Sequence, residues 1–316
     1  MNLWHRLEVD YKVVMTGEGS DELFGGYPAF RRDMFLHGLD DLPQQEREAC
    51  EGLLQESNSL VQGAMLPAAQ VDDPDLDAVV GFTPSCLQPW LACVPLVPDL
   101  LAEHHRLAVE GYSPGKAIAA QLDRDQLEGR HALDKAQYVW IKTMLEGQIL
   151  TWGGDRVDMA NSMEARPAFL DHHLAAVAVQ VPPELRMKGK TEKYVLREAM
   201  AGLLPEVLYK REKFAFMAPP AHTEPEKWAQ MQSLAAEYLS DEAIDAAGLL
   251  SKNGVRALFD RHDSPETTEA DRVQMDAVIN HLLGVQMLHR MFVAADVPQQ
   301  ARQEAERLGW RIPVEA

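Results

Sequence analysis

The pattern of apolar and polar positions changes along the chain from one short strand to a series of helices. Residues 11–15 are β-branched or apolar and predict a strand, preceded by a short helix at 3–7. From Leu133, apolar residues recur at helical spacing and predict a long core helix up to Thr151. Gly153 and Gly154 are expected to stop this helix.

Further helices are predicted on both sides of this core helix. Residues 40–130 predict short helices joined by loops. Later helices are expected after Asp155, over 171–181 with Asp171 as cap, over 191–201 with Thr191 as cap, from Pro205, and over 272–291, with a polar tail at 297–316. The β-like stretch 177–181 lies inside 174–182, where alanines and the capping Asp171 favour a helix, so the partner strands of 11–15 are expected outside this chain.

Composition narrows the classes of function. The chain has 316 residues, of which 46% are hydrophobic, and a formal net charge of −19. Nucleic acids and anionic membranes bind clustered positive charge, so neither partner is expected. There is no apolar run of membrane-spanning length, and the three cysteines form no C-x-x-C pair. The sequence predicts a cytoplasmic protein that acts on small molecules, with a homodimer as a further expectation.

A glycine-rich, acidic loop follows the predicted strand. It reads Thr16-Gly-Glu-Gly-Ser-Asp-Glu-Leu-Phe-Gly-Gly26. Glycines let backbone N–H groups approach a ligand closely, and carboxylates beside them hold Mg²⁺ on phosphates or act as a base. The loop is neither a Walker A motif nor a Rossmann fingerprint. The same residues also suit a capped turn at a helix start, and their chemistry alone does not choose between the two.

Two later segments carry charged residues in dense patterns. The first, 152–171, contains Asp155, Glu164 and Arg166, which also suit charged helix ends and an ion pair in a turn. The second, 188–214, contains Lys190 and Lys213 in a basic stretch of an otherwise acidic chain. Lysine there predicts a phosphate contact, and a solvated basic face is the alternative.

The three segments, in this order, resemble the asparagine synthetases. Residues 13–27 are similar to the signature loop of that family. The second segment differs from the family pattern in one respect: in Glu164-Ala-Arg-Pro167-Ala-Phe-Leu-Asp171 the proline is shifted by one position. The resemblance implies a mainly α chain with a residual strand. It would be the C-terminal part of an α/β adenine nucleotide α-hydrolase-like (PP-loop ATPase) synthetase domain. Residues 1–220 would form the partial domain, with the loop at 13–27 and a helical core at 133–215, and 221–316 a helical extension.

The resemblance also implies chemistry and site residues. Members of the family adenylate aspartate with ATP before ammonia displaces AMP. Thr16 and Gly17 would contact the nucleotide, and Glu18 would lie near the reacting carboxyl and ammonia. Asp21 would bind Mg²⁺ and pyrophosphate, and Lys213 would contact the phosphates. Further substrate or phosphate contacts are predicted for Asp155, Glu164, Arg166 and Lys190.

Two parts of the family pattern are missing from the sequence. Met1 is followed by Asn2 and not by Cys, and no S-G-G-x-D-S loop precedes Thr16. The upstream synthetase segment and the glutaminase domain are therefore expected outside this chain, which alone would be inactive. Two alternatives remain: a related carboxylate-adenylating cyclase that closes lactam or lasso-peptide rings, and a non-catalytic truncated remnant.

Overall fold

The chain folds into two compact, mainly helical units. In the computed structural model, residues 12–39, 44, 48, 70–211 and 220–310 are described. Trp152 is described by its backbone alone. The first unit comprises 1–91 and 113–217, and the second 92–112 and 218–316. The predicted helix at 3–7 lies outside the described residues, and the predicted domain boundary at 220 stays a prediction.

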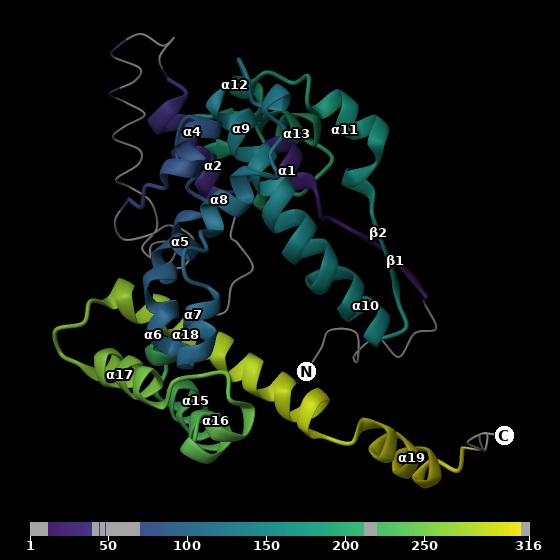
Figure 1. Cartoon of the computed structure of the whole chain (residues 1–316). Coiled ribbons are helices and arrows are strands. Elements are labelled where there is room, and N and C mark those ends of the chain that lie inside the picture. Colours follow the sequence, from purple (N-terminus) through teal and green to yellow (C-terminus); the bar gives the residue numbers. More distant parts are fainter. Residues whose placement is uncertain (1–11, 40–43, 45–47, 49–69, 212–219, 311–316) are drawn as a thin grey trace. The chain divides into compact units, whose positions relative to one another are not determined.

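Two short strands lie side by side in the first unit. Strand β1 (Val13–Thr16) pairs in parallel with β2 (Glu164–Pro167), with Val13 opposite Glu164 (Figure 1). The expectation that β1 lacks a partner within this chain was therefore wrong. β2 has no β-branched residue, and its extended form comes from tertiary pairing, including a 2.8 Å bond from the Glu164 N–H to the Lys12 carbonyl.

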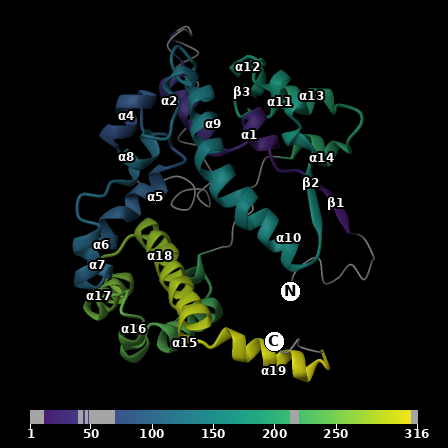
Figure 2. The same cartoon turned by 45° about the vertical axis from the view of Figure 1, so that its right-hand side comes forward.

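One long helical rod leads to β2. Helix α9 (Ala132–Trp140) continues as a π-helix, Ile141–Arg156, and then as α10 (Val157–Ala160) (Figure 2). The predicted core helix is present, but the prediction that Gly153 and Gly154 stop it was wrong. A glycine costs a helix only about 1 kcal/mol, which continued backbone hydrogen bonding can outweigh.

The first unit contains further helices, of which α1 (Ser20–Phe24) and α2 (Pro28–His37) pack on α9. The others are α4 (Pro74–Val80), α8 (Pro114–Ala119), α11 (His172–Ala178), α12 (Pro183–Arg186), α13 (Tyr194–Ala199) and α14 (Glu206–Lys210); α5 (Gln88–Cys93) leads out of the unit. Their core includes Phe30, Leu133 and Met187, all almost fully buried.

The predicted caps of two of these helices had different outcomes. Asp171 caps α11 by accepting the backbone N–H groups of His173 and Leu174, as predicted. Thr191 was wrongly predicted as a cap. It lies in β4 (Thr191–Glu192), which pairs with β3 (Met187–Lys188), and the N-cap of α13 is Lys193. Thr191 and Glu192, which were predicted as the start of a helix over 191–201, instead form one strand of the β3–β4 hairpin.

The second unit is a separate helical cluster. It contains α6 (Val97–Leu100), α7 (Glu103–Ala108), α15 (Pro225–Tyr238), α16 (Asp241–Ala247), α17 (Lys252–Asp263), α18 (Glu269–Leu288) and α19 (Val297–Arg307). Met231, Leu258 and Ile279 lie in its core. The predicted helix near 272–291 is confirmed as α18, whereas the predicted polar tail is helical over α19. Among the described residues, no helix is both long and apolar enough to cross a membrane.

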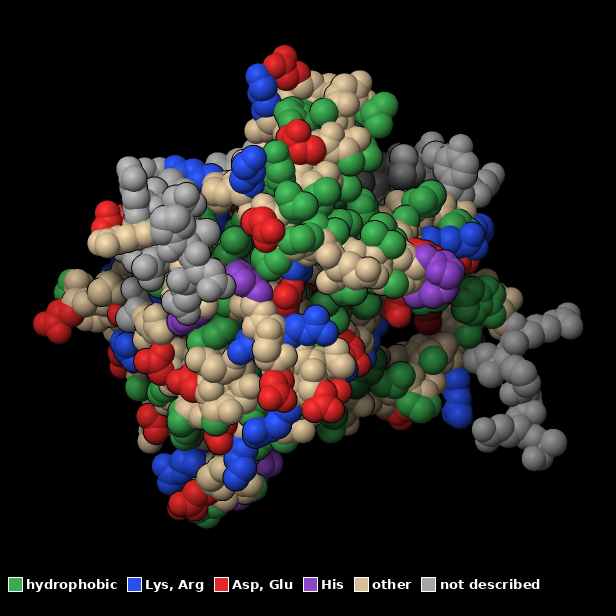
Figure 3. Space-filling view, turned by 90° about the horizontal axis from the view of Figure 1, so that it is seen from above, with side chains coloured by type: hydrophobic (Ala, Val, Ile, Leu, Met, Phe, Trp, Pro, Cys, Tyr) green, Lys and Arg blue, Asp and Glu red, His purple; other side chains and the backbone are tan. Residues whose placement is uncertain are grey.

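Several large apolar side chains of the first unit remain exposed. Val177, Val179, Leu203 and Val207 expose between 62% and 74% of their surface. Figure 3 shows hydrophobic side chains gathered near the middle of the face seen from above, with acidic and basic side chains around them. Scattered charge of both signs on this face is unlike the basic stripe of a nucleic-acid-binding surface.

One acidic side chain of the first unit is completely buried. Asp33, on α2, accepts the backbone N–H of Ser85 with both carboxylate oxygens, at 3.0 and 3.1 Å. Burial penalises the charged form and raises the pKa of Asp33 to about 7 from an ordinary 3.8, although the bonds from Ser85 and the charge of Arg32 oppose the shift.

This burial predicts how stability depends on pH. Between about pH 4 and pH 7 the folded chain keeps a proton on Asp33 that the unfolded chain has released, so the stability contributed by this residue falls as pH rises. We expect Asp33→Asn to flatten the fall in the free energy of unfolding between pH 4.5 and 7.5, measured by urea denaturation. The exposed Asp72→Asn should leave that slope unchanged, and an equal slope in wild type and Asp33→Asn would contradict the assignment.

Candidate active site

The loop between β1 and α1 has a shape that only glycine permits. Gly19, the N-cap of α1, has a φ of 92°, and a Cβ there would overlap the side chain of Leu170. The Leu23 N–H donates to the Gly19 carbonyl at 2.9 Å, so α1 begins directly after this residue. The loop is thereby packed against the segment that follows β2.

An ion pair fixes the start of α1. Lys193 Nζ lies 2.8 Å from Asp21 Oδ1 and donates to Ser20 Oγ at 3.1 Å. The two charged side chains are only 18% and 12% exposed. Gly26 passes so close that a Cβ would overlap the Asp21 carboxylate and lie 2.5 Å from Lys193 Cε. Close packing on one side and charge on the other hold this lysine in place.

Two oxygens of the loop are buried without a hydrogen-bond partner. They are Thr16 Oγ1 and Glu18 Oε2. Buried polar atoms in folded proteins usually have a partner, and strain, a catalytic role, or a bound water, ion or ligand accounts for an exception. Both atoms belong to residues predicted for the site, Thr16 for the nucleotide and Glu18 for the reacting groups. The unsatisfied oxygens are the feature that a ligand would complete.

A second carboxylate faces Glu18 from the end of the helical rod. Asp158, on α10, is buried, and its pKa is raised by desolvation and then by the negative charges of Glu18 and Asp155. The three carboxylates therefore act on one another through their fields. Such a cluster favours a positively charged group, and a carboxylate within it can accept a proton.

A buried polar network holds α1 against α9. Glu22 Oε1 accepts the Tyr27 hydroxyl and the Trp140 indole N–H, both at 3.0 Å, and the Glu22 carbonyl accepts the Gln137 amide. Gln137 Oε1 in turn accepts Arg186 at 2.5 Å. Burial raises the pKa of Glu22 above its ordinary value, against the effect of these bonds. Glu22 thus positions α1 and does not face the loop chemistry.

The remaining predicted site residues lie in different surroundings. Glu164 and Arg166 form an exposed ion pair with each other on β2, with Nε 2.7 Å from Oε1. Asp155, Lys190 and Gly17 are exposed. Lys213 lies outside the described residues. The structure therefore brings together Thr16, Glu18 and Asp21, and its geometry gives no further support to a ligand contact by Glu164 or Arg166.

Sequence reasoning missed Lys193 and Asp158 as site residues. Lys193 lies in the recognised basic stretch, but its position depends on a φ of 52°, an uncommon conformation for a residue other than glycine. Asp158 lies three residues after Asp155, so helical spacing placed both near one face. That spacing was the available signal, and it did not show which of the two is buried.

Comparison with known proteins gives matches over most of the chain. The family model described as asparagine synthase matches residues 3–290. The amidase chyE of Penicillium rubens is 32% identical over 221 residues, covering 66% of this chain and 32% of its own length. The asparagine synthetase [glutamine-hydrolyzing] 1 of Bacillus subtilis is 30% identical over 266 residues, covering 83% of this chain and 38% of its own length. The chain thus spans about a third of the length of these relatives.

The close approach of Gly26 predicts a sharp effect of one methyl group. We expect Gly26→Ala to displace the Asp21–Lys193 pair and to lower the free energy of unfolding by about 1–3 kcal/mol, the usual cost of overpacking. Gly17→Ala, in the same loop, is the matched control, because a Cβ there meets nothing within 4 Å. Equal stability of the two variants in urea denaturation would contradict the described packing.

Proposed function

This chain belongs to the asparagine synthase family, and on that premise we propose that it is part of an ATP-dependent ligase that converts aspartate into asparagine. The observation that carries the proposal is the pair of buried, unsatisfied oxygens on Thr16 and Glu18, beside the Asp21–Lys193 ion pair. The Thr16 hydroxyl can donate to or accept from a nucleotide, whereas the Glu18 carboxylate needs a donor, which ammonium or the amino group of aspartate would supply. ATP and aspartate are thus its proposed small-molecule ligands.

In the proposed first step, an oxygen of the aspartate side-chain carboxylate bonds to the α-phosphorus of ATP, and the bond to pyrophosphate breaks. Thr16 and Gly17 contact the nucleotide. Negative charge builds up on the departing pyrophosphate, and a fixed cation stabilises that charge best in a partly buried site. Lys193 supplies such a cation, and Lys213 is proposed to act beside it. The product is β-aspartyl-AMP.

In the proposed second step, the ammonia nitrogen attacks the acyl carbon, and AMP leaves with the electron pair of the broken C–O bond. The attacking nitrogen must lose a proton, and Glu18 is the proposed acceptor. Asp158, which interacts with both Glu18 and Asp155, adds negative charge next to Glu18. Negative charge at this place favours the binding of a positively charged ammonium ion before attack.

Mg²⁺ is proposed to reach this site with the nucleotide. Asp21 is the proposed carboxylate ligand, and an oxygen ligand of this type suits the ion. Asp21 is paired with Lys193 at 2.8 Å. The two roles are compatible if Lys193 and the ion share the Asp21 carboxylate, so that both positive charges would stand next to the departing phosphates.

The working enzyme is proposed to contain more than this chain. On the two-stranded sheet, Met15 is 75% exposed and Val13 is 41% exposed. Exposed apolar residues on a short strand pair support further strands beside them, which an upstream synthetase segment would supply. A glutaminase domain is the proposed source of ammonia, and the cytoplasm the proposed location. The amidase name of a 32% identical relative supports a second candidate, amide formation on another carboxylate.

Two variants test this proposal in enzyme reconstituted with the upstream segment by fusion or co-expression. Lys193→Met should slow aspartate-dependent exchange of pyrophosphate into ATP by about 100-fold or more, because it removes charge stabilisation at the leaving group. Glu18→Gln should retain the exchange and lose asparagine formation from ammonia. Other carboxylic acids tested in the exchange assay distinguish aspartate as the substrate from the second candidate, in which another carboxylate supports the exchange.

The control is Lys227→Met in the second unit, whose ammonium is exposed and pairs with Glu224. It should match the wild-type enzyme in both assays. Asparagine formation at the wild-type rate by both Lys193→Met and Glu18→Gln would remove these residues from the chemistry and refute the proposed mechanism.

A further inference from the structure

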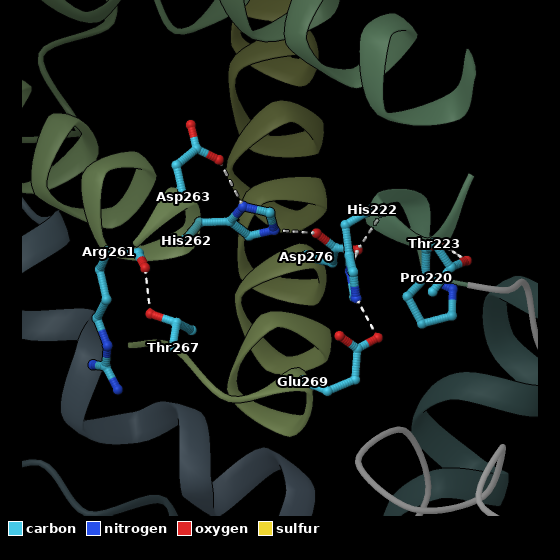
Figure 4. A network of polar contacts seen from close by, with 9 residues as sticks. All are labelled: Pro220, His222, Thr223, Arg261, His262, Asp263, Thr267, Glu269 and Asp276. Carbon is cyan, nitrogen blue, oxygen red and sulfur yellow. Dashed lines mark hydrogen bonds and ion pairs between the residues drawn. The ribbon is translucent and has the colours of Figure 1, made fainter. Parts of the chain in front are cut away.

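Two histidines and an aspartate converge inside the second unit, apart from the residues discussed so far. His222 lies in the 3₁₀ turn Ala221–Thr223, His262 near the end of α17, and Asp276 on α18 (Figure 4). The side chains of His262 and Asp276 are each 4% exposed, and that of His222 is 9% exposed. Three elements distant in sequence thus place three polar groups in an apolar core.

The Asp276 carboxylate bridges the two imidazole rings. His222 Nδ1 lies 2.7 Å from Asp276 Oδ2, and His262 Nε2 lies 3.0 Å from Asp276 Oδ1. One potential ligand atom from each of the three residues falls within 4.8 Å of the other two. Among the described residues, this group alone combines three His, Cys, Asp or Glu side chains at that spacing.

The outer nitrogen of each ring also contacts a carboxylate. Glu269 Oε1 lies 2.8 Å from His222 Nε2, and Asp263 Oδ1 lies 3.1 Å from His262 Nδ1. Trp228 stacks on His262 with ring centroids 4.2 Å apart. Histidines that bind metals usually donate their second N–H to a carboxylate, which fixes the ring and increases its basicity. This outer arrangement is independent of the inner one and supports the same kind of ligand.

The electrostatics of the pocket favour positive charge. The carboxylates of Glu269 and Asp276 lie 2.8 and 2.7 Å from the two ring nitrogens of His222 and place negative charge on both sides of it. Each inner nitrogen can donate to Asp276 only while it carries a hydrogen. A divalent cation between the rings would take the place of these hydrogens, which would leave as protons.

We propose that His222 Nδ1, His262 Nε2 and the Asp276 carboxylate bind a divalent transition-metal ion of the zinc class. Two imidazoles and one carboxylate suit Zn²⁺ or Co²⁺ better than Mg²⁺ or Ca²⁺, which prefer oxygen ligands alone. Metal–ligand bonds of about 2.0–2.1 Å in a tetrahedron separate ligand atoms by about 3.3 Å. The two histidine–aspartate contacts, at 2.7 and 3.0 Å, would therefore open slightly, and the ring nitrogens, which lie within 4.8 Å of each other, would draw together around the ion. A water molecule completes the fourth position.

The ion would join the turn Ala221–Thr223 to α17 and α18 and would thereby stabilise the fold of the second unit. The Asp276 carboxylate also accepts the His222 backbone N–H at 3.1 Å, which already ties the turn to α18. An ion at this junction adds its binding free energy to folding of the second unit. Amide formation in the first unit needs none of these residues, so the proposal stands or falls separately from the proposed function.

The test is metal binding to the full chain, prepared without a polyhistidine tag and stripped with a chelator. We expect one Zn²⁺ per chain in competition with a chromophoric chelator, a higher melting temperature with Zn²⁺, and visible d–d absorbance with Co²⁺ of tetrahedral intensity. Glu269→Gln removes an outer carboxylate and should weaken Zn²⁺ binding by roughly 10- to 100-fold. His222→Gln removes a ligand and should weaken it by more.

The matched control is the double variant His172→Gln, His173→Gln, which removes an exposed histidine pair from α11. It should bind Zn²⁺ as the wild-type chain does. Circular dichroism of each stripped variant separates lost binding from lost folding, and Glu269 is exposed enough to be replaced without affecting the core. The proposal would be overturned if the wild-type chain did not bind Zn²⁺ stoichiometrically. It would also be overturned if the folded His222→Gln and Glu269→Gln variants bound Zn²⁺ with the affinity of the wild-type chain.

Discussion

The ion pair between Asp21 and Lys193 is the contact on which the candidate active site depends. Lys193 reaches α1 from a position 173 residues after Ser20 and bonds to both Asp21 and Ser20. Both charged groups are mostly buried, so removal of either leaves an uncompensated charge in a poorly solvated place, which costs more than an exposed pair contributes. The pair therefore fixes where the loop after β1 lies relative to the β3–β4 hairpin.

Everything else in the site follows from that position. With α1 held by Lys193 on one side and by the Glu22 network on the other, the loop cannot turn to satisfy its own buried oxygens. The positive φ of Lys193 is a local strain of order 1 kcal/mol, which persists only where the surroundings fix it. The first unit thus keeps unsatisfied polar atoms and backbone strain at the same place, the usual signs of a site prepared for a ligand.

The sequence predicted the parts of the fold that local chemistry determines. β1, the cap at Asp171 and the helix near 272–291 follow from β-branched residues, a capping carboxylate and apolar spacing. Strand β2 and the π-helix did not follow, because both depend on pairing and packing between distant segments. Helix α19 was missed because its polar composition resembles that of a tail.

The site divides in the same way. Thr16, Glu18 and Asp21 lie next to one another in sequence, so a family resemblance in one loop located all three. Lys193 enters through a turn whose conformation no local pattern predicts. Lys190 and Lys213 of the same basic stretch were predicted and Lys193 was not, because basic charge alone does not distinguish a lysine directed at α1 from one directed at solvent.

The most direct test of this account is the coupling free energy between Asp21 and Lys193. A double-mutant cycle with Asp21→Asn, Lys193→Met and the double variant measures it from the free energies of unfolding in urea. The account predicts that the single variants are not additive and that the coupling is about 1–3 kcal/mol in favour of the pair. Additive effects, within about 0.3 kcal/mol, would contradict the claim that this contact holds the site together.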